Sequence, residues 1–320
     1  MGIFTSGGDS PGMNACIRAV VRTGIFHGLE VIGICRGYDG MIDGEFIPMD
    51  SSSVSNIIQR GGTILKSARS PRFRTPEGRK QAHEQLTAAG IQAVVAIGGD
   101  GTFAGARVFH EEYGFPMVGV AGTIDNDLYG TDSAIGYDTA LNTAVRAIDQ
   151  IRDTAASHDR LFFVEVMGRD AGFLALRSGI AGGAERVLVP ETKTDINQLI
   201  QSLETGWKRR KSSSIIVVAE GEEEGGAVEI ARKVKEKFTH YETRVTVLGH
   251  VQRGGSPTCF DRVLASELGY AAVVAVLEGM SNIMVGKVKG EISYVPFEKA
   301  IKHHNDLNEN LLRLVEILSS

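Results

Sequence analysis

Short apolar runs alternate with longer helical stretches along most of the chain. The runs are rich in valine and isoleucine and are bounded by glycine or polar residues, as in strands that are buried on both faces of a parallel sheet. We expect a short strand at residues 3–5 and further strands at 31–34, 93–97, 117–120, 161–166, 186–189, 214–218 and 243–248. The stretches between them predict helices at 14–27, 77–89, 103–112, 138–157, 195–210, 226–239 and 261–278.

This alternation predicts the α/β fold class with doubly wound, Rossmann-like parallel sheets. A length of 320 residues suggests about two domains. We therefore expect two such domains that face each other across an active-site cleft. Ligands of such sheets bind beyond the carboxyl ends of the strands, where the glycine-rich and charged segments of this chain lie.

The amino-acid composition indicates which kinds of ligand, partner and compartment suit this chain. Glycine accounts for 39 of 320 residues, about 12% against a usual 7%, which indicates many tight turns and close approaches of backbone to a ligand. The net charge of −5 argues against a nucleic-acid partner. No apolar run reaches the roughly 18 residues that a membrane span needs, and no signal-peptide pattern opens the chain. Cys16, Cys35 and Cys259 are widely separated, which fits free thiols in a reducing, cytoplasmic compartment.

The segment Gly98-Gly99-Asp100-Gly101-Thr102 follows a predicted strand and precedes a predicted helix. Its glycines let backbone N–H groups reach phosphate oxygens, and Asp100 offers a hard oxygen ligand for Mg²⁺. The alternative is a tight turn whose aspartate caps the helix. Its position after a buried strand favours nucleotide binding.

A second segment, Gly122-Thr123-Ile124-Asp125-Asn126-Asp127, also follows a strand. Two carboxylates two residues apart can lie on one side of an extended turn. One of them can then accept a proton as a base, while the other orients that base or holds a cation. An ordinary solvated turn remains open as the alternative.

Two further glycine segments follow strands, at residues 5–14 and 249–255. The first lacks both the P-loop and the dinucleotide spacing, yet it precedes a helix as a phosphate-binding loop does. The second places His250, Gln252 and Arg253 between glycines, which favours ligand contact. Arginine suits a sugar phosphate because its planar fork matches phosphate oxygens, although each single arginine could be a surface residue. The candidates are Arg69, Arg160, Arg169, Arg244 and Arg253.

Taken together, these segments resemble the bacterial ATP-dependent 6-phosphofructokinases from Thr5 to about Leu277. The matching runs, in the family's order, are residues 5–14, 60–63, 67–69, 98–102, 122–127, 165–169 and 247–257. The resemblance implies a larger ATP-binding domain at 1–136 plus about 253–300. It also implies a smaller fructose 6-phosphate-binding domain at 137–252 plus about 301–320.

The resemblance also implies residue roles for transfer of the γ-phosphoryl group of ATP to the 1-hydroxyl of fructose 6-phosphate. Asp125 would be the general base, with Asp127 and Thr123 beside it, and Arg169 and Arg69 would serve the transferring phosphoryl. Asp100 would hold Mg²⁺. The implied ATP site comprises Gly8, Tyr38, Arg69, Ser70, Gly99, Asp100, Gly101 and Thr102. The implied sugar site comprises Thr123, Ile124, Asp125, Arg160, Met167, Gly168, Arg169, Glu220, Arg244, His250, Val251, Gln252 and Arg253.

In this family the counterparts of Arg160 and Arg244 reach in from a neighbouring subunit, so the resemblance implies a homotetramer with shared active sites. It also implies an intersubunit site for ADP or phosphoenolpyruvate at Arg18, Arg22, Arg152, Gly183, Glu185, Arg209 and Lys211. Serines at 51, 212 and 213 replace further basic or histidine side chains of relatives, which predicts an altered or weakened response. Ser70 stands where relatives often have an aromatic residue near the nucleotide.

The same motifs allow four alternative functions. Pyrophosphate-dependent members of the family carry Asp and Lys where this chain has Gly101 and Gly122, so two glycines favour ATP. Lipid kinases and NAD kinases also contain the Gly-Gly-Asp-Gly-Thr run, but they lack the other motifs of this chain. A nicotinamide oxidoreductase would need a dinucleotide-binding fingerprint, which this sequence does not contain. A non-catalytic regulatory subunit is disfavoured because the predicted catalytic aspartates and arginines are all retained.

Overall fold

The computed structural model describes residues 1–157, 160–209, 214–302 and 307–319, and the chain divides into two compact units. The first unit consists of Met1–Ile124, Leu128–Thr139 and Arg253–Asn305. The second consists of Asp125–Asp127, Ala140–Gln252 and Asp306–Ser320. The chain therefore passes from one unit to the other inside two of the segments that the sequence singled out, after Ile124 and after Gln252.

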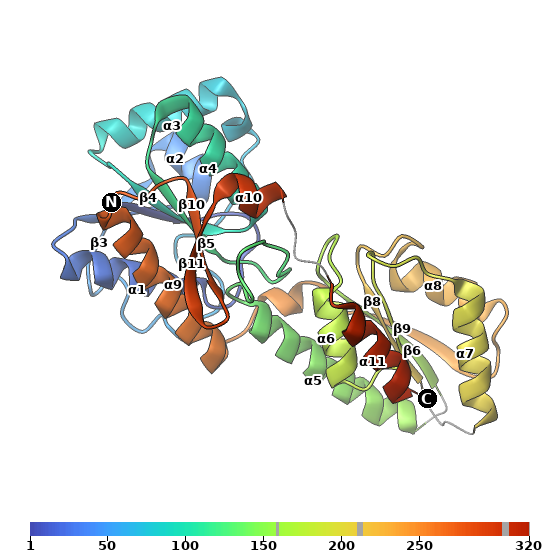
Figure 1. Cartoon of the computed structure of the whole chain (residues 1–320). Helices are drawn as coiled ribbons and strands as arrows, with labels where there is room; N and C mark the ends of the chain where they lie inside the picture. Colours follow the sequence, from blue (N-terminus) through green and yellow to red (C-terminus); the bar gives the residue numbers. More distant parts are fainter. Residues whose placement is uncertain (158–159, 210–213, 303–306, 320) are drawn as a thin grey trace. The chain divides into compact units, whose positions relative to one another are not determined.

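The first unit is built on a seven-stranded sheet with the order β11-β10-β5-β4-β1-β2-β3 (Figure 1). Its strands are β1 (Gly2–Thr5), β2 (Val31–Ile34), β3 (Phe46–Met49), β4 (Val94–Gly98), β5 (Met117–Ala121), β10 (Ile283–Val288) and β11 (Glu291–Pro296). The five inner strands are parallel, whereas β3 pairs antiparallel with β2 and β11 pairs antiparallel with β10. The inner strands are parallel as expected, and the two antiparallel edge strands are an addition that the sequence did not predict.

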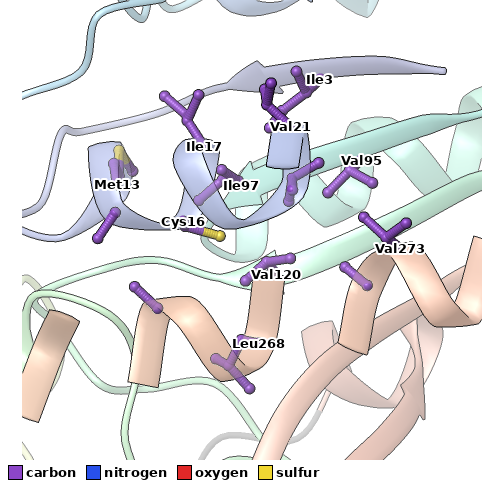
Figure 2. Close-up of a cluster of buried hydrophobic side chains, with 14 of the residues drawn as sticks. Ile3, Met13, Cys16, Ile17, Val21, Val95, Ile97, Val120, Leu268 and Val273 are labelled. Carbon is purple, nitrogen blue, oxygen red and sulfur yellow. The ribbon is translucent and has the colours of Figure 1, made fainter. Parts of the chain in front are cut away.

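Helices cover both faces of this sheet because successive strand residues point to opposite sides. On one face Ile3, Val95 and Val120 pack against α1 (Met13–Phe26) and α9 (Cys259–Leu277), as Figure 2 shows. On the other face Phe4 and Val94 lie in a second cluster with side chains of the remaining helices of the unit. Those helices are α2 (Gly37–Asp43), α3 (Pro76–Ala88), α4 (Asp100–Tyr113) and α10 (Phe297–Lys302), with a 3-10 turn η1 (Arg72–Arg74).

The second unit has a four-stranded, fully parallel sheet with the order β7-β8-β6-β9. Its strands are β6 (Arg160–Val166), β7 (Arg186–Leu188), β8 (Ser214–Ala219) and β9 (Glu242–Val247). Its helices are α5 (Tyr137–Ala156, which begins in the first unit), α6 (Phe173–Ala181), α7 (Ile196–Lys208), α8 (Gly226–Lys235) and α11 (Glu309–Ser319), with the 3-10 turn η2 at Gly249–Arg253. Leu161, Phe163 and Val218 form a buried cluster with α7 and α8.

The α/β class, the two doubly wound sheets and the predicted strands are confirmed. Among the described residues, seven helices and strands with weak local signals were not expected: β3, α2, α6, β10, β11, α10 and α11. The helix α2 contains two glycines in seven residues, yet it forms because Tyr38, Met41 and Ile42 are buried in the core. Among the residues that the structure describes, no helix is long and apolar enough to span a membrane.

Candidate active site

Five of the strands in the described residues are followed directly by a segment that the sequence singled out. Ser6 follows β1, Gly99 follows β4, Gly122 follows β5, Met167 follows β6 and Glu220 follows β8. The sequence predicted this arrangement, because the carboxyl ends of parallel strands are where such sheets bind ligands.

The turn after β4 is the first turn of a helix. Gly99 caps α4 in an extended conformation, and its carbonyl accepts the amides of Thr102 (3.0 Å) and Phe103 (3.1 Å). The Asp100 carboxylate accepts the amide of Gly101 at 2.7 Å. The predicted helix start at residue 103 was therefore three residues late. The early start places the N-terminus of α4, with its positive dipole end, directly at the glycines.

The glycines of this turn face different surroundings. A Cβ at Gly98 would lie 2.3 Å from Thr102 Oγ1 and 2.8 Å from the Ser6 carbonyl oxygen, so only glycine fits. A Cβ at Gly99 would make an ordinary contact with Thr123 at 3.6 Å, which places the turn next to the segment after β5. A Cβ at Gly101 would meet nothing within 4 Å.

Tyr38 supports this turn. Its side chain is buried, stacks on Phe73 with 3.9 Å between ring centroids, and donates its hydroxyl to the Thr102 carbonyl oxygen at 2.6 Å. Burial raises the pKa of the phenol, so the hydroxyl stays a donor. Ser70 hydrogen-bonds Asp39 through its hydroxyl, which also accepts the Phe73 amide at 3.2 Å. The side chain of Arg69, next to it, is exposed.

The loop after β1 is held by long-range contacts. Asn14 accepts the Ile64 amide at 2.8 Å and donates to the carbonyls of Arg60 and Gly61, so it ties α1 to the 60–63 segment. Arg253 donates to the Asp9 carbonyl at 3.3 Å, and its guanidinium lies 2.5 Å from where a Cβ of Gly8 would be. Arg253 thus contacts the loop that contains Gly8.

The segment after β5 is bent. Gly122 donates its amide to Gly98 at 2.9 Å, and Thr123 and Ile124 are buried. Asn126 has a φ of 57°, in the left-handed region, so the expectation of an extended turn at residues 125–127 was wrong. Asn tolerates this conformation better than most residues, which accounts for its place between the two aspartates. Asp125 is 2% exposed and Asp127 is half-buried.

Within the second unit, Asp125 lies beside Arg169. The Arg169 Nε and Asp125 Oδ2 atoms are 3.4 Å apart, and Arg169 also has a left-handed φ of 50°. Glu220 stabilises this conformation by accepting the amides of Arg169 (2.8 Å) and Gly168 (3.3 Å). Gln252, fully buried, accepts the Met167 amide at 3.3 Å. Three predicted segments therefore position one arginine against one carboxylate.

Three charged side chains meet at the start of β6 and β9. Arg160 donates to Glu242 at 2.9 Å, and Arg244 donates to the other oxygen of the same carboxylate. The structure thus brings two of the predicted phosphate-binding arginines together. His250 and Val251 are exposed on η2.

The predicted effector residues lie on several elements. Arg18 and Arg22 are one turn apart on α1 in the first unit. In the second unit Arg152 donates to the carbonyls of Gly182 and Gly183 at 2.5 and 2.6 Å. Glu185 donates its amide to Ile215, and Arg209 is exposed at the end of α7. Lys211, like the serines at 212 and 213, lies outside the described residues.

The residues around Asp100 bear on whether a metal could bind there. No group of three or more His, Cys, Asp or Glu side chains that could hold an ion occurs in the described part of the chain. Mg²⁺ in nucleotide sites uses one or two carboxylates, water and substrate phosphates rather than a cage of protein ligands. A single half-buried carboxylate, Asp100, at a helix N-terminus beside glycines fits that pattern.

Sequence reasoning missed one buried carboxylate. Asp261 is fully buried and accepts the Gly136 amide (2.9 Å) and both the amide and hydroxyl of Thr139 (2.8 and 2.5 Å). Burial raises its pKa. It anchors the start of α5, where the chain leaves the first unit. The Thr258-x-x-Asp261 capping pattern was a signal that could have pointed to it.

Comparison with known proteins identifies the family of the chain. The family model described as phosphofructokinase matches residues 1–276. An "ATP-dependent 6-phosphofructokinase" of Cytophaga hutchinsonii is 57% identical over 99% of this chain and 97% of its own length. The "ATP-dependent 6-phosphofructokinase 1" of Thermus thermophilus is 59% identical over 100% of this chain and 99% of its own. The solved phosphofructokinase of Saccharomyces cerevisiae superposes with a TM-score of 0.89 at 36% identity, covering 99% of this chain and 47% of the yeast chain.

The parallel sheets and the named activity of these relatives place the chain among the α/β phosphotransferases. The chain belongs to the phosphofructokinase family.

Proposed function

We propose that the chain is an ATP-dependent 6-phosphofructokinase that converts fructose 6-phosphate and ATP to fructose 1,6-bisphosphate and ADP. The observation that carries the proposal is the pair of Asp125 and Arg169, in which a 2% exposed carboxylate lies 3.4 Å from a guanidinium. A proton acceptor and a cation for developing phosphoryl charge are thereby side by side. Relatives 57% and 59% identical over nearly the whole chain are named for this activity.

The nucleotide is bound by the first unit. Amides at the N-terminus of α4 and in the loop after β1 receive phosphate oxygens, with Arg69 near the transferring group. Asp100 would hold Mg²⁺, which supplies neutralisation of phosphate charge. Tyr38 acts on this site through its hydrogen bond to the Thr102 carbonyl. Gly8, Ser70, Gly99, Gly101 and Thr102 complete the site.

We assign sugar binding to residues of the second unit, and Thr123 and Ile124 remain further predicted contacts of the sugar. Asp125 accepts the proton of the 1-hydroxyl as that oxygen attacks the γ-phosphorus, and ADP leaves. Arg169 stabilises the charge that spreads over the transferring oxygens, so positioning and electrostatics do most of the catalysis. Glu220 and Gln252 keep the Met167–Arg169 backbone in place. Arg160, Arg244, His250, Val251 and Arg253 receive the 6-phosphate, and Asp127 assists Asp125.

We infer ATP rather than pyrophosphate as the phosphoryl donor from the room that two glycine positions leave for the nucleotide. The position of Gly101 is open, so that its lack of a side chain leaves room for the α-phosphate. At Gly122 a Cβ would already lie 2.9 Å from Ile97 Cγ2, so a lysine there would have to displace the β4 side chain. Activity on pyrophosphate with none on ATP is not expected from this chain.

Assembly and regulation follow from the family. We propose a homotetramer in which Arg160 and Arg244 complete a neighbour's site, and an ADP or phosphoenolpyruvate response weakened by the missing basic side chains. Because Cys16, Cys35 and Cys259 are free thiols, a cytoplasmic location is the one we propose.

The test is a coupled assay of Asp125→Ser. Turnover should fall by about 10²- to 10⁴-fold while the KM for either substrate stays within about tenfold, because only a transition-state interaction is lost. Asp149→Ser, on the exposed side of α5, removes the same charge and should leave turnover unchanged. Near-wild-type turnover in the Asp125 variant would refute the assigned base.

A further inference from the structure

One carboxylate holds both arginines at the start of the β6–β9 ladder. Glu242 accepts Arg160 Nε at 2.9 Å through Oε2 and Arg244 Nη2 through Oε1. The Glu242 side chain is 49% exposed, Arg160 22% and Arg244 50%. The proposed function gives these two arginines the 6-phosphate of the sugar, so the substrate and Glu242 are partners for the same two cations.

The register of β6 and β9 places these three side chains next to one another. Arg160 is the Cα partner of Glu242, and Phe162 is the partner of Arg244, in the parallel pair of β6 and β9. Residues two apart on a strand share a face, so Arg160, Glu242 and Arg244 lie on one face of the sheet. Glu242 therefore sits between the arginines in the strand geometry itself.

The carboxylate resembles the ligand in charge and in geometry. Guanidinium groups bind carboxylate and phosphate oxygens by the same charge-assisted hydrogen bonds. A phosphate dianion on both arginines would lie within a few ångström of the Glu242 charge, and like charges at such a distance repel even in high dielectric. An exposed ion pair of this kind adds little to fold stability, so stability is a weak reason for its presence.

We propose that Glu242 is an internal competitor for the phosphate-binding arginine pair, which lowers the affinity of the enzyme for its phosphorylated sugar. The carboxylate occupies the guanidinium donors when the sugar is absent and is displaced or crowded when the 6-phosphate binds. The inference rests on the proposed function and adds a residue that sets the working range of sugar phosphate concentration.

The test is steady-state kinetics of Glu242→Gln in the full-length protein. Glutamine keeps a side-chain oxygen for one arginine and removes the charge. We expect the half-saturating concentration of fructose 6-phosphate to fall about threefold to tenfold, with the KM for ATP and the turnover number unchanged. The effect should shrink as ionic strength rises from about 0.05 to 0.5 M, because salt screens exposed charges.

The matched control is Glu229→Gln. Glu229 is also exposed and also paired with an arginine, Arg232 on α8, and the substitution changes net charge by the same amount. Its kinetics should equal those of the wild type. Binding of fructose 6-phosphate without ATP, measured by calorimetry, should show the same tightening in the Glu242 variant only.

The outcomes separate the two proposals. A wild type that neither binds nor phosphorylates fructose 6-phosphate overturns the proposed function itself. An active wild type with an unchanged half-saturating concentration in Glu242→Gln overturns the competitor and leaves the function standing. A raised value would mean that Glu242 organises the arginines instead, which also contradicts the inference.

Discussion

Two glycines three residues apart, Gly98 and Gly101, should respond oppositely to the same added methyl group. Gly98 is the buried last residue of β4, and a Cβ there would lie 2.3 Å from Thr102 Oγ1 and 2.8 Å from the Ser6 carbonyl oxygen. Thr102 is 3% exposed and the Ser6 amide is bonded to Ile97, so neither can move away freely. Gly101 lies in the first turn of α4 with nothing within 4 Å of the added atom.

The magnitudes follow from these surroundings. Overpacking at a rigid site costs about 1–3 kcal/mol, so Gly98→Ala should lose stability in that range. Gly101→Ala removes the entropic penalty of a helical glycine and should gain up to about 1 kcal/mol. The two variants should therefore differ by about 1–4 kcal/mol. For a domain of this size each kcal/mol shifts Tm by about 2–4 °C, which predicts a separation of roughly 2–16 °C.

Differential scanning calorimetry measures the separation, since it can resolve the transitions of two domains. The protein has one tryptophan, Trp207, which lies on α7 in the second unit. Its fluorescence transition should stay the same in both variants and so serves as the internal control. A Gly98→Ala protein that melts within about 2 °C of the wild type, less than the shift expected from 1 kcal/mol, would refute the packing argument.

Three further substitutions test other contacts. Gly101→Asp should lower kcat/KM for ATP by about fivefold or more, since charge repulsion at about 4 Å is worth roughly 1–4 kcal/mol. It should not lower Tm, and Gly101→Asn should lose less activity. Arg79→Met should cost about 2–3 kcal/mol in urea unfolding, because it removes two 2.6 Å bonds to Glu112 and two to backbone carbonyls. The hydrogen bond from Arg79 lowers the pKa of Glu112 from 4.5, so the Glu112 part of this contribution is present above that value and is lost as the pH falls through the lowered pKa. The difference between wild type and variant should then shrink to the part that the two backbone hydrogen bonds supply. Asp261→Asn should cost about 1–3 kcal/mol, since an amide cannot accept the three N–H and O–H groups that two carboxylate oxygens accept; an unchanged Tm would contradict this.

Local patterns in the sequence predicted a large part of the fold. Continuous Val and Ile runs predicted β5 and β8 to within a residue or two, because strands buried on both faces need apolar side chains on both. They did not predict β11, which pairs antiparallel at the sheet edge and has a mixed burial pattern. They also missed α2, whose glycines oppose helix formation and whose apolar side chains are buried only in the assembled core.

The candidate residues for the chemistry could be predicted from the sequence alone. Glycine and aspartate directly after a buried strand favour phosphate and metal binding, because backbone access and a hard oxygen are local properties. Tertiary structure decided which of those side chains act on one another. The Tyr38 hydroxyl meets the Thr102 carbonyl across 64 positions, and Glu242 meets Arg160 across 82. Such partners depend on strand order and register, and the short-range periodicity of a sequence contains neither.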